Sequence, residues 1–224
     1  MISVNPSEKD PKSTHIDVAL TPGRALTGTV VDPAGQPLAD AHGAGLGATP
    51  KFFDRSEGKL ATANFTVSGL NPKKSRSVLF IHPEKKLAKL MTIRPDEPGP
   101  LTMRLEPTGT LAGRVVDATG KPLAGLKVAA QLSFKPEDTK DLPAELRFNY
   151  PTWSKLTNGV ATTGKDGKFR VDGLIPGLRY NLMVNDRDPQ PGKRAVAYVE
   201  DLSVESSKTK DLGDLKGKAS AKEE

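Results

Sequence analysis

The side chains that could do chemistry are few and scattered along this 224-residue chain. There is no cysteine, which excludes disulfides, thiolate catalysis and cysteine-bound zinc. The chain has three histidines, which are His15, His42 and His82. His82 and Glu84 lack the spacing of a zinc-ligand pair, and the two carboxylates of Asp186 and Asp188 are too few for a calcium site. We therefore expect no catalytic residue, no metal site and no cofactor.

A stretch rich in aromatic residues is the best candidate for a binding site. Its members are Phe134, Arg147, Phe148, Tyr150 and Trp153, and Trp153 is the only tryptophan of the chain. Aromatic side chains on a long loop can stack on a sugar or anchor a protein partner. The other interpretation is structural, with the same side chains capping the edge of the fold or filling the gap between domains. The sequence favours this second interpretation.

An internal repeat indicates which elements carry these residues. Residues 26–40 return as residues 111–125, so that Gly28 corresponds to Gly113 (113 − 28 = 85). A second block, residues 65–72, returns as residues 169–176 at a larger offset (169 − 65 = 104). The two offsets differ by 19 residues (104 − 85 = 19), which places an insertion in the second copy, within residues 133–158.

Each repeat predicts a strand followed by a turn. Alternation along residues 111–116 is typical of a half-buried strand. In the turn that follows, the Asp117 side chain can bond the backbone two residues on, and Gly120 can adopt a positive φ. Alternation along residues 126–132 predicts the strand that pairs with the first one. The sequence Lys165-Asp-Gly-Lys168 predicts a tight hairpin turn.

Further strands are expected at residues 87–93, 101–105, 195–202 and 211–215. Such short strands separated by turns predict an all-β fold with two tandem antiparallel β-sandwich domains, Ig-like or prealbumin-like. The expected boundaries are a disordered leader at 1–14, a first sandwich at 15–106, a second sandwich at 107–215 with its insertion at 133–158, and a disordered tail at 216–224. Residues 16–20 match residues 101–105, so we expect them to be the last strand of a preceding module in a longer protein.

The repeated residues resemble carboxypeptidase regulatory-like domains, which are also described as transthyretin-like. The second copy carries nearly the whole pattern, from Gly113 to Tyr180. The first copy departs from it, with Asp40 at a glycine position, Arg76 in place of Tyr180, and no Asp-Gly turn. The resemblance implies mostly non-catalytic modules of bacterial secreted or surface proteins, so an extracytoplasmic location is favoured over a cytoplasmic one. Tyr180 resembles the tyrosine of a sandwich corner, and we expect a packed ring.

The first repeat block is also similar to the opening of intradiol ring-cleaving dioxygenases, which hold iron with two tyrosines and two closely spaced histidines. This chain has no such histidine pair, and its tyrosines are Tyr150, Tyr180 and Tyr198. We therefore expect no iron site. Cross-strand Lys–Asn isopeptide bonds occur in related surface sandwiches, and the sequence alone leaves that alternative open.

The charge pattern argues against two classes of partner. The net charge is +6, but 33 basic residues are mixed with 27 acidic ones, so we expect no nucleic-acid partner. No apolar run reaches roughly 18 residues, so we expect no membrane insertion. The sequence predicts a monomeric, non-catalytic pair of structural or interaction modules from a larger bacterial protein, acting as spacer, scaffold or docking surface for a protein partner. The alternative is a module that binds carbohydrate or another polymer through its insertion.

Overall fold

A computed structural model describes residues 23–47, 58–147, 151–185 and 196–217. The predicted leader at 1–14 and the predicted strand at 16–20 lie outside these residues. The last strand, β14 (Thr209–Lys216), ends one residue later than the predicted second sandwich. Lys216 is therefore part of a strand, and residues 218–224 of the predicted tail lie outside the described part.

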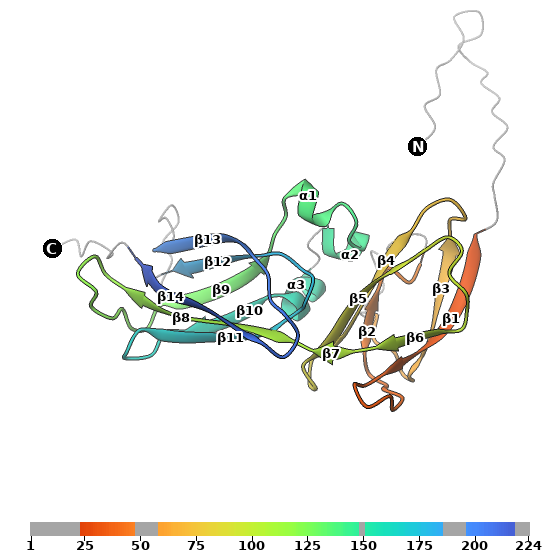
Figure 1. The fold of residues 1–224 in the computed structure, drawn as a ribbon, viewed down its shortest axis with the longest axis horizontal. Helices are drawn as coiled ribbons and strands as arrows, with labels where there is room; N and C mark the ends of the chain where they lie inside the picture. The colour runs from red at the N-terminus through yellow and green to blue at the C-terminus, as the bar shows by residue number, and fades with distance from the viewer. Residues whose placement is uncertain (1–22, 48–57, 148–150, 186–195, 218–224) are drawn as a thin grey trace, which may run out of the picture.

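The strands form four sheets that face one another in two pairs (Figure 1). In the first sandwich, a sheet of order β3-β1-β6 faces a sheet of order β2-β4-β5-β7. These strands are β1 (Arg24–Val31), β2 (His42–Ala44), β3 (Asn64–Leu70), β4 (Arg76–His82), β5 (Leu87–Ile93), β6 (Leu101–Arg104) and β7 (Glu106–Pro107).

In the second sandwich, a sheet of order β11-β8-β14 faces a sheet of order β10-β9-β12-β13. The remaining strands are β8 (Gly109–Val116), β9 (Lys127–Leu132), β10 (Gly159–Thr162), β11 (Lys168–Leu174), β12 (Tyr180–Asn185) and β13 (Ala197–Leu202). The insertion between β9 and β10 forms short helices, which are α1 (Pro136–Thr139), α2 (Ala144–Arg147) and α3 (Pro151–Thr157). The predicted all-β sandwich class is confirmed.

Alternating side chains from the facing sheets form each core, as the strand pattern predicts. In the first core, Val30 and Val67 meet Val78 and Phe80, and all four are fully buried. In the second core, the fully buried side chains include Val115, Val128, Val171 and Leu182.

The turn after each repeated strand has the predicted chemistry. Asp117 Oδ1 accepts hydrogen bonds from the backbone N–H groups of Thr119 (2.8 Å) and Lys121 (2.9 Å). The Thr119 hydroxyl donates to the same carboxylate. This bond, followed by the backbone bonds, holds the pKa of Asp117 below its usual range. Gly120 has a φ of 87°, a conformation that glycine adopts without steric cost.

The pairing of the strands differs from the prediction in three respects. The strand at 126–132, which is β9, pairs with β10 and β12 in the sheet opposite β8. The Asp166-Gly167 turn joins β10 to β11, which belong to different sheets, so it is a corner between sheets and not a hairpin. Two pairs are parallel, β1 with β6 and β8 with β14, and in each pair the first strand of a sandwich lies beside a strand from its C-terminal end.

Candidate functional site

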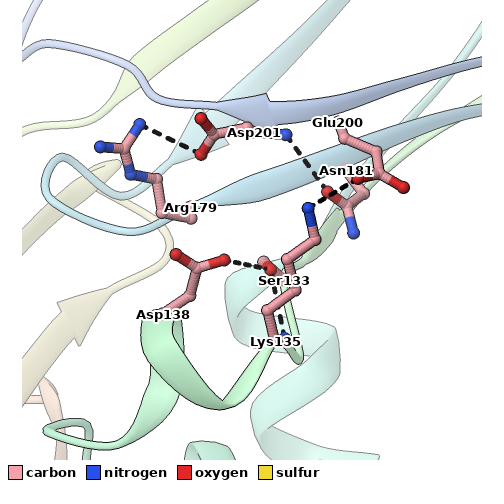
Figure 2. Close-up of polar contacts among 7 residues, drawn as sticks. All are labelled: Ser133, Lys135, Asp138, Arg179, Asn181, Glu200 and Asp201. Atoms are coloured by element: carbon pink, nitrogen blue, oxygen red, sulfur yellow. Dashed lines mark hydrogen bonds and ion pairs between the residues drawn. The ribbon is translucent and has the colours of Figure 1, made fainter.

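The insertion begins beside the β12–β13 edge of the second sandwich (Figure 2). Ser133 is buried, and its hydroxyl donates to Asp138 Oδ2 at 2.6 Å, which fixes the entry into α1. The Lys135 ammonium lies 2.6 Å from Glu200 Oε2 on β13. The Glu200 pKa is lowered and the Lys135 pKa is raised by this contact. Both side chains are solvent-exposed, so this ion pair contributes little to the free energy of unfolding. Its effect is to hold the start of the insertion beside β13.

The other polar groups in Figure 2 also bond to one another. Arg179, which precedes β12, lies 3.3 Å from Asp201 Oδ1 on β13. The Asp201 backbone N–H donates to Asn181 Oδ1 at 3.4 Å. Each carboxylate drawn there has a cation or hydroxyl partner, so the cluster has the character of surface ion pairs and not of an acid–base pair.

The middle of the insertion turns away from this edge and contacts the first sandwich. Leu146 of α2 is only 1% exposed and packs in the same apolar cluster as Ala44 and Leu79 of the first sandwich. The Gly45 backbone N–H donates to Glu145 Oε1 at 3.3 Å. Leu146 and Glu145 of the insertion therefore contact the first sandwich at the junction. The structural role that the sequence suggested for the aromatic side chains stays a prediction.

A hollow of about 410 Å³ lies at this junction. It is lined by Arg76, Ser77 and Thr92 of the first sandwich and by residues 140–145 and Arg147 of the insertion. Arg76 donates to the carbonyl oxygens of Gly47, Ser68 and Gly69, and partial burial lowers its pKa although Glu145 opposes this. The guanidinium is thus already engaged with the backbone.

A larger hollow, of about 690 Å³, lies on the first sandwich beside β1 and β3. Its described lining is made of hydroxyl, amide and apolar groups, among them Thr27, Thr29, Asn64 and Phe65. None of the lining residues that the structure describes is titratable, so these residues offer no acid or base.

The predicted binding residues are only partly placed. Phe134 is 44% exposed next to the Lys135 contact, and Arg147 is exposed at the end of α2. Phe148 and Tyr150 lie outside the described residues, and Trp153 belongs to α3 without a described side chain. The aromatic binding site stays a prediction.

The described histidines lie in the first sandwich, and the described tyrosines lie in the second. His42 lies on β2 of the first sandwich, and buried His82 ends β4, where its Nδ1 accepts from the Lys85 N–H at 3.3 Å. Tyr180 is in the second core, and Tyr198 is half exposed on β13. Within residues 23–47, 58–147, 151–185 and 196–217, no three His, Asp or Glu side chains gather as a metal site.

An isopeptide bond would need a lysine and an asparagine brought together in a core. Among the described residues, the buried polar side chains are His82, Thr110, Ser133, Thr139, Thr157 and Thr163, which include neither type. We expect the intact mass of the purified chain to equal the mass calculated from its sequence. A mass lower by one ammonia would contradict this and reveal a Lys–Asn bond.

The sequence comparisons assign no family. No protein-family model matches the chain, and no curated protein matches it. Membership of the carboxypeptidase regulatory-like family therefore stays a prediction.

Three solved structures illustrate the structural similarity. A shaft pilin from Lactobacillus rhamnosus GG is 14% identical, with a TM-score of 0.33, and the alignment covers 88% of this chain and 98% of that one. A streptococcal ancillary pilin is 15% identical, with a TM-score of 0.31 and coverage of 88% and 62%. The pilus backbone protein of Streptococcus pneumoniae is 15% identical, with a TM-score of 0.26 and coverage of 81% and 57%. At these values the likeness reaches no further than strands arranged in sandwiches.

The residues that sequence reasoning missed are those of the junction. On β4, Leu79 and Ile81 point away from the first core and are buried at 0% and 3% exposure. The available signal was the unbroken apolar run of residues 78–81, because a strand with one solvated face alternates and a strand buried on both faces does not.

No helix in the described ranges is long and apolar enough to cross a membrane.

Proposed function

We propose that the chain is a non-catalytic pair of structural modules, residues 15–106 and 107–215, that holds its two ends at a fixed spacing and orientation. The observation that carries the proposal is the buried junction between the sandwiches. A spacer or scaffold needs such a junction, whereas a freely jointed pair of domains would have a long polar linker.

The apolar part of the junction supports this rigidity. Ala44, Leu79, Ile81 and Ala88 line the outer face of the β2-β4-β5 sheet, and each is at most 3% exposed. They share one cluster with Leu146 and with the core of the second sandwich. Burying such side chains stabilises a contact by about 25 cal/mol per Å² of apolar surface, so opening the junction would be costly.

The connecting chain is itself part of the sheets. β7 pairs with β5, and only Thr108 separates it from β8. The Thr108 N–H donates to the Lys86 carbonyl at 2.9 Å. Lys86 in turn lies 3.8 Å from Asp172 of the second sandwich, whose pKa is lowered chiefly by the Thr110 hydroxyl and further by Arg170 and Lys86. The link between the two sandwiches is therefore a single residue, Thr108, whose N–H is already hydrogen-bonded.

The test is to replace Leu146 by Asp in the full chain. An unpaired carboxylate in an apolar junction is strongly disfavoured, so α2 should leave β2 and the sandwiches should reorient independently. We expect NMR relaxation to give one common rotational correlation time for both sandwiches in the parent chain and shorter, unequal values in the variant. Far-ultraviolet circular dichroism should retain the strand signal in both.

Phe134→Ala is the matched control, because Phe134 belongs to the same insertion but is 44% exposed. It should leave the common correlation time unchanged. Independent tumbling already present in the parent chain would contradict a spacer function.

The proposed setting is extracytoplasmic, with a protein partner at one or both ends. Polymer binding by the insertion is the alternative, and among its predicted residues Phe134 and Arg147 are the ones described as exposed. Binding of the parent chain to a polysaccharide, lost in Phe134→Ala while the common correlation time persists, would favour that alternative.

A further inference from the structure

One row of apolar side chains crosses the outer face of the β10-β9-β12-β13 sheet. The strand register places Val160 opposite Ala129, Ala129 opposite Met183, and Met183 opposite Tyr198. Val160 is 68% exposed and Tyr198 is 50% exposed. Single exposed apolar residues are ordinary on a protein surface, but a row that spans every strand of a sheet is a candidate contact surface.

The same row exists in the first sandwich, where it is covered. There the register places Ala44 opposite Leu79, and Leu79 opposite Leu90. The repeat offsets make Ala44 equivalent to Ala129 (129 − 44 = 85) and Leu79 equivalent to Met183 (183 − 79 = 104). Ala44 and Leu79 are fully buried in the cluster that contains Leu146 of the next sandwich. The fold therefore uses this row as the contact face toward a following sandwich.

The chain also leaves both sandwiches at the same point. The Leu105 N–H donates to the Val31 carbonyl at 2.9 Å, and the Gly217 N–H donates to the Val116 carbonyl at 2.8 Å. Val31 and Val116 are equivalent positions of the repeat (116 − 31 = 85). Gly217 thus corresponds to Leu105, the residue from which the chain passes along β7 into the second sandwich.

We propose that the row Val160–Ala129–Met183–Tyr198 is the docking surface for a further sandwich of the same type, seated end-on with its insertion over the row. The occupant presents a leucine-bearing short helix, as α2 presents Leu146 to the first sandwich. This rests on the proposed function, because it extends the same rigid junction by one module.

The face of the second sandwich is less apolar than its equivalent in the first. Ile81, which is covered, corresponds to Asn185 (185 − 81 = 104), and Gln131 and Asn181 lie on the other side of the row. The amides bear no charge, but the exposed Lys127 lies opposite Asn185 on the same face, so covering this side would also desolvate a cation. We therefore expect a contact of the same geometry but of lower stability.

The test is an extended chain in which residues 106–217 are repeated directly after Gly217. Tyr198 of the added sandwich is changed to Phe, so that only Tyr198 of the middle sandwich is followed. We expect the nitration rate of this tyrosine to be about tenfold lower than in the parent chain, since a covered side chain reacts only during opening. Leu146→Asp in the added sandwich alone should restore the parent rate.

Folding of the added sandwich is followed through its own Tyr180, which is fully buried in the parent. An unprotected middle Tyr198 beside a protected added Tyr180 would overturn the proposal. So would an added sandwich that fails to fold, because the same sequence folds behind the first sandwich. Concentration-dependent dimers of the parent chain that disappear in Tyr198→Asp would mean that a second copy is the occupant instead. Rigidity of the parent pair is measured separately, so failure here leaves the proposed function standing.

Discussion

Tyr180→Ala is expected to lower the free energy of unfolding of the second sandwich by about 3–5 kcal/mol, the range for removing a buried aromatic ring. Tyr180 is 0% exposed and lies in the core between the two sheets. Its hydroxyl accepts a hydrogen bond from the Ile175 N–H at 2.9 Å. The substitution leaves a cavity and a buried N–H without a partner, and both effects destabilise the fold.

Tyr180→Phe separates the two contributions. The ring remains, so only the hydrogen bond is lost, and leaving the Ile175 N–H unpaired should cost about 1–3 kcal/mol. Urea unfolding followed by circular dichroism measures both variants. Tyr198→Ala is the exposed control and should stay within about 0.5 kcal/mol of the parent. A Tyr180→Phe variant as stable as the parent would show that the hydroxyl contributes nothing.

The equivalent corner of the first sandwich is formed by a different residue. Arg76 occupies the position equivalent to Tyr180 (180 − 76 = 104) and donates to the carbonyl oxygens of Gly69, Ser68 and Gly47. A tyrosine corner accepts from the backbone, whereas the arginine donates to it. The departure of the first copy from the repeat pattern therefore changes the corner chemistry and leaves the sandwich intact.

Strand positions were predictable from the sequence, but strand neighbours were not. Alternation along residues 111–116 and 169–174 locates β8 and β11, because one side of each strand must face a core. The same alternation is satisfied by any partner strand in either sheet. The pairing of β8 with β14 depends on contacts far apart in sequence, so the local pattern at 126–132 wrongly suggested β9 as its neighbour.

The insertion shows a second limit of local reasoning. Its aromatic residues drew attention as a binding site, whereas the apolar side chain buried most completely among the described residues of the insertion is Leu146. A leucine on a one-turn helix carries no periodicity, and its burial depends on the outer face of another sandwich. Only the unbroken apolar run at residues 78–81 pointed to that face from the sequence.

The repeated glycine at the centre of each first strand can now be explained by packing. Gly28 lies opposite Phe65 and Gly113 lies opposite Phe169 in the strand register. A Cβ added at Gly28 would lie 2.4 Å from the Phe65 ring and 2.7 Å from the Leu101 carbonyl oxygen. At Gly113 the corresponding distances, to Phe169 and to the Gly213 oxygen, are 3.0 and 3.1 Å. Both glycines leave room for the aromatic ring over the backbone, and the first site is the tighter one.

Gly28→Ala is therefore expected to lower the unfolding free energy of the first sandwich by about 1–3 kcal/mol, the usual cost of overpacking. Phe65 cannot retreat, because its ring packs against Phe80 with centroids 4.7 Å apart. At Gly113 the steric cost is smaller. It is offset by a stabilisation of about 0.4–1 kcal/mol, because alanine restricts the unfolded chain more than glycine does, so Gly113→Ala should be nearly neutral. Urea unfolding of both variants measures the difference. In a Phe65→Leu background the cost of Gly28→Ala should fall, leaving only the Leu101 carbonyl contact. Equal costs at the two glycines would mean that backbone conformation, and not the ring, explains their recurrence.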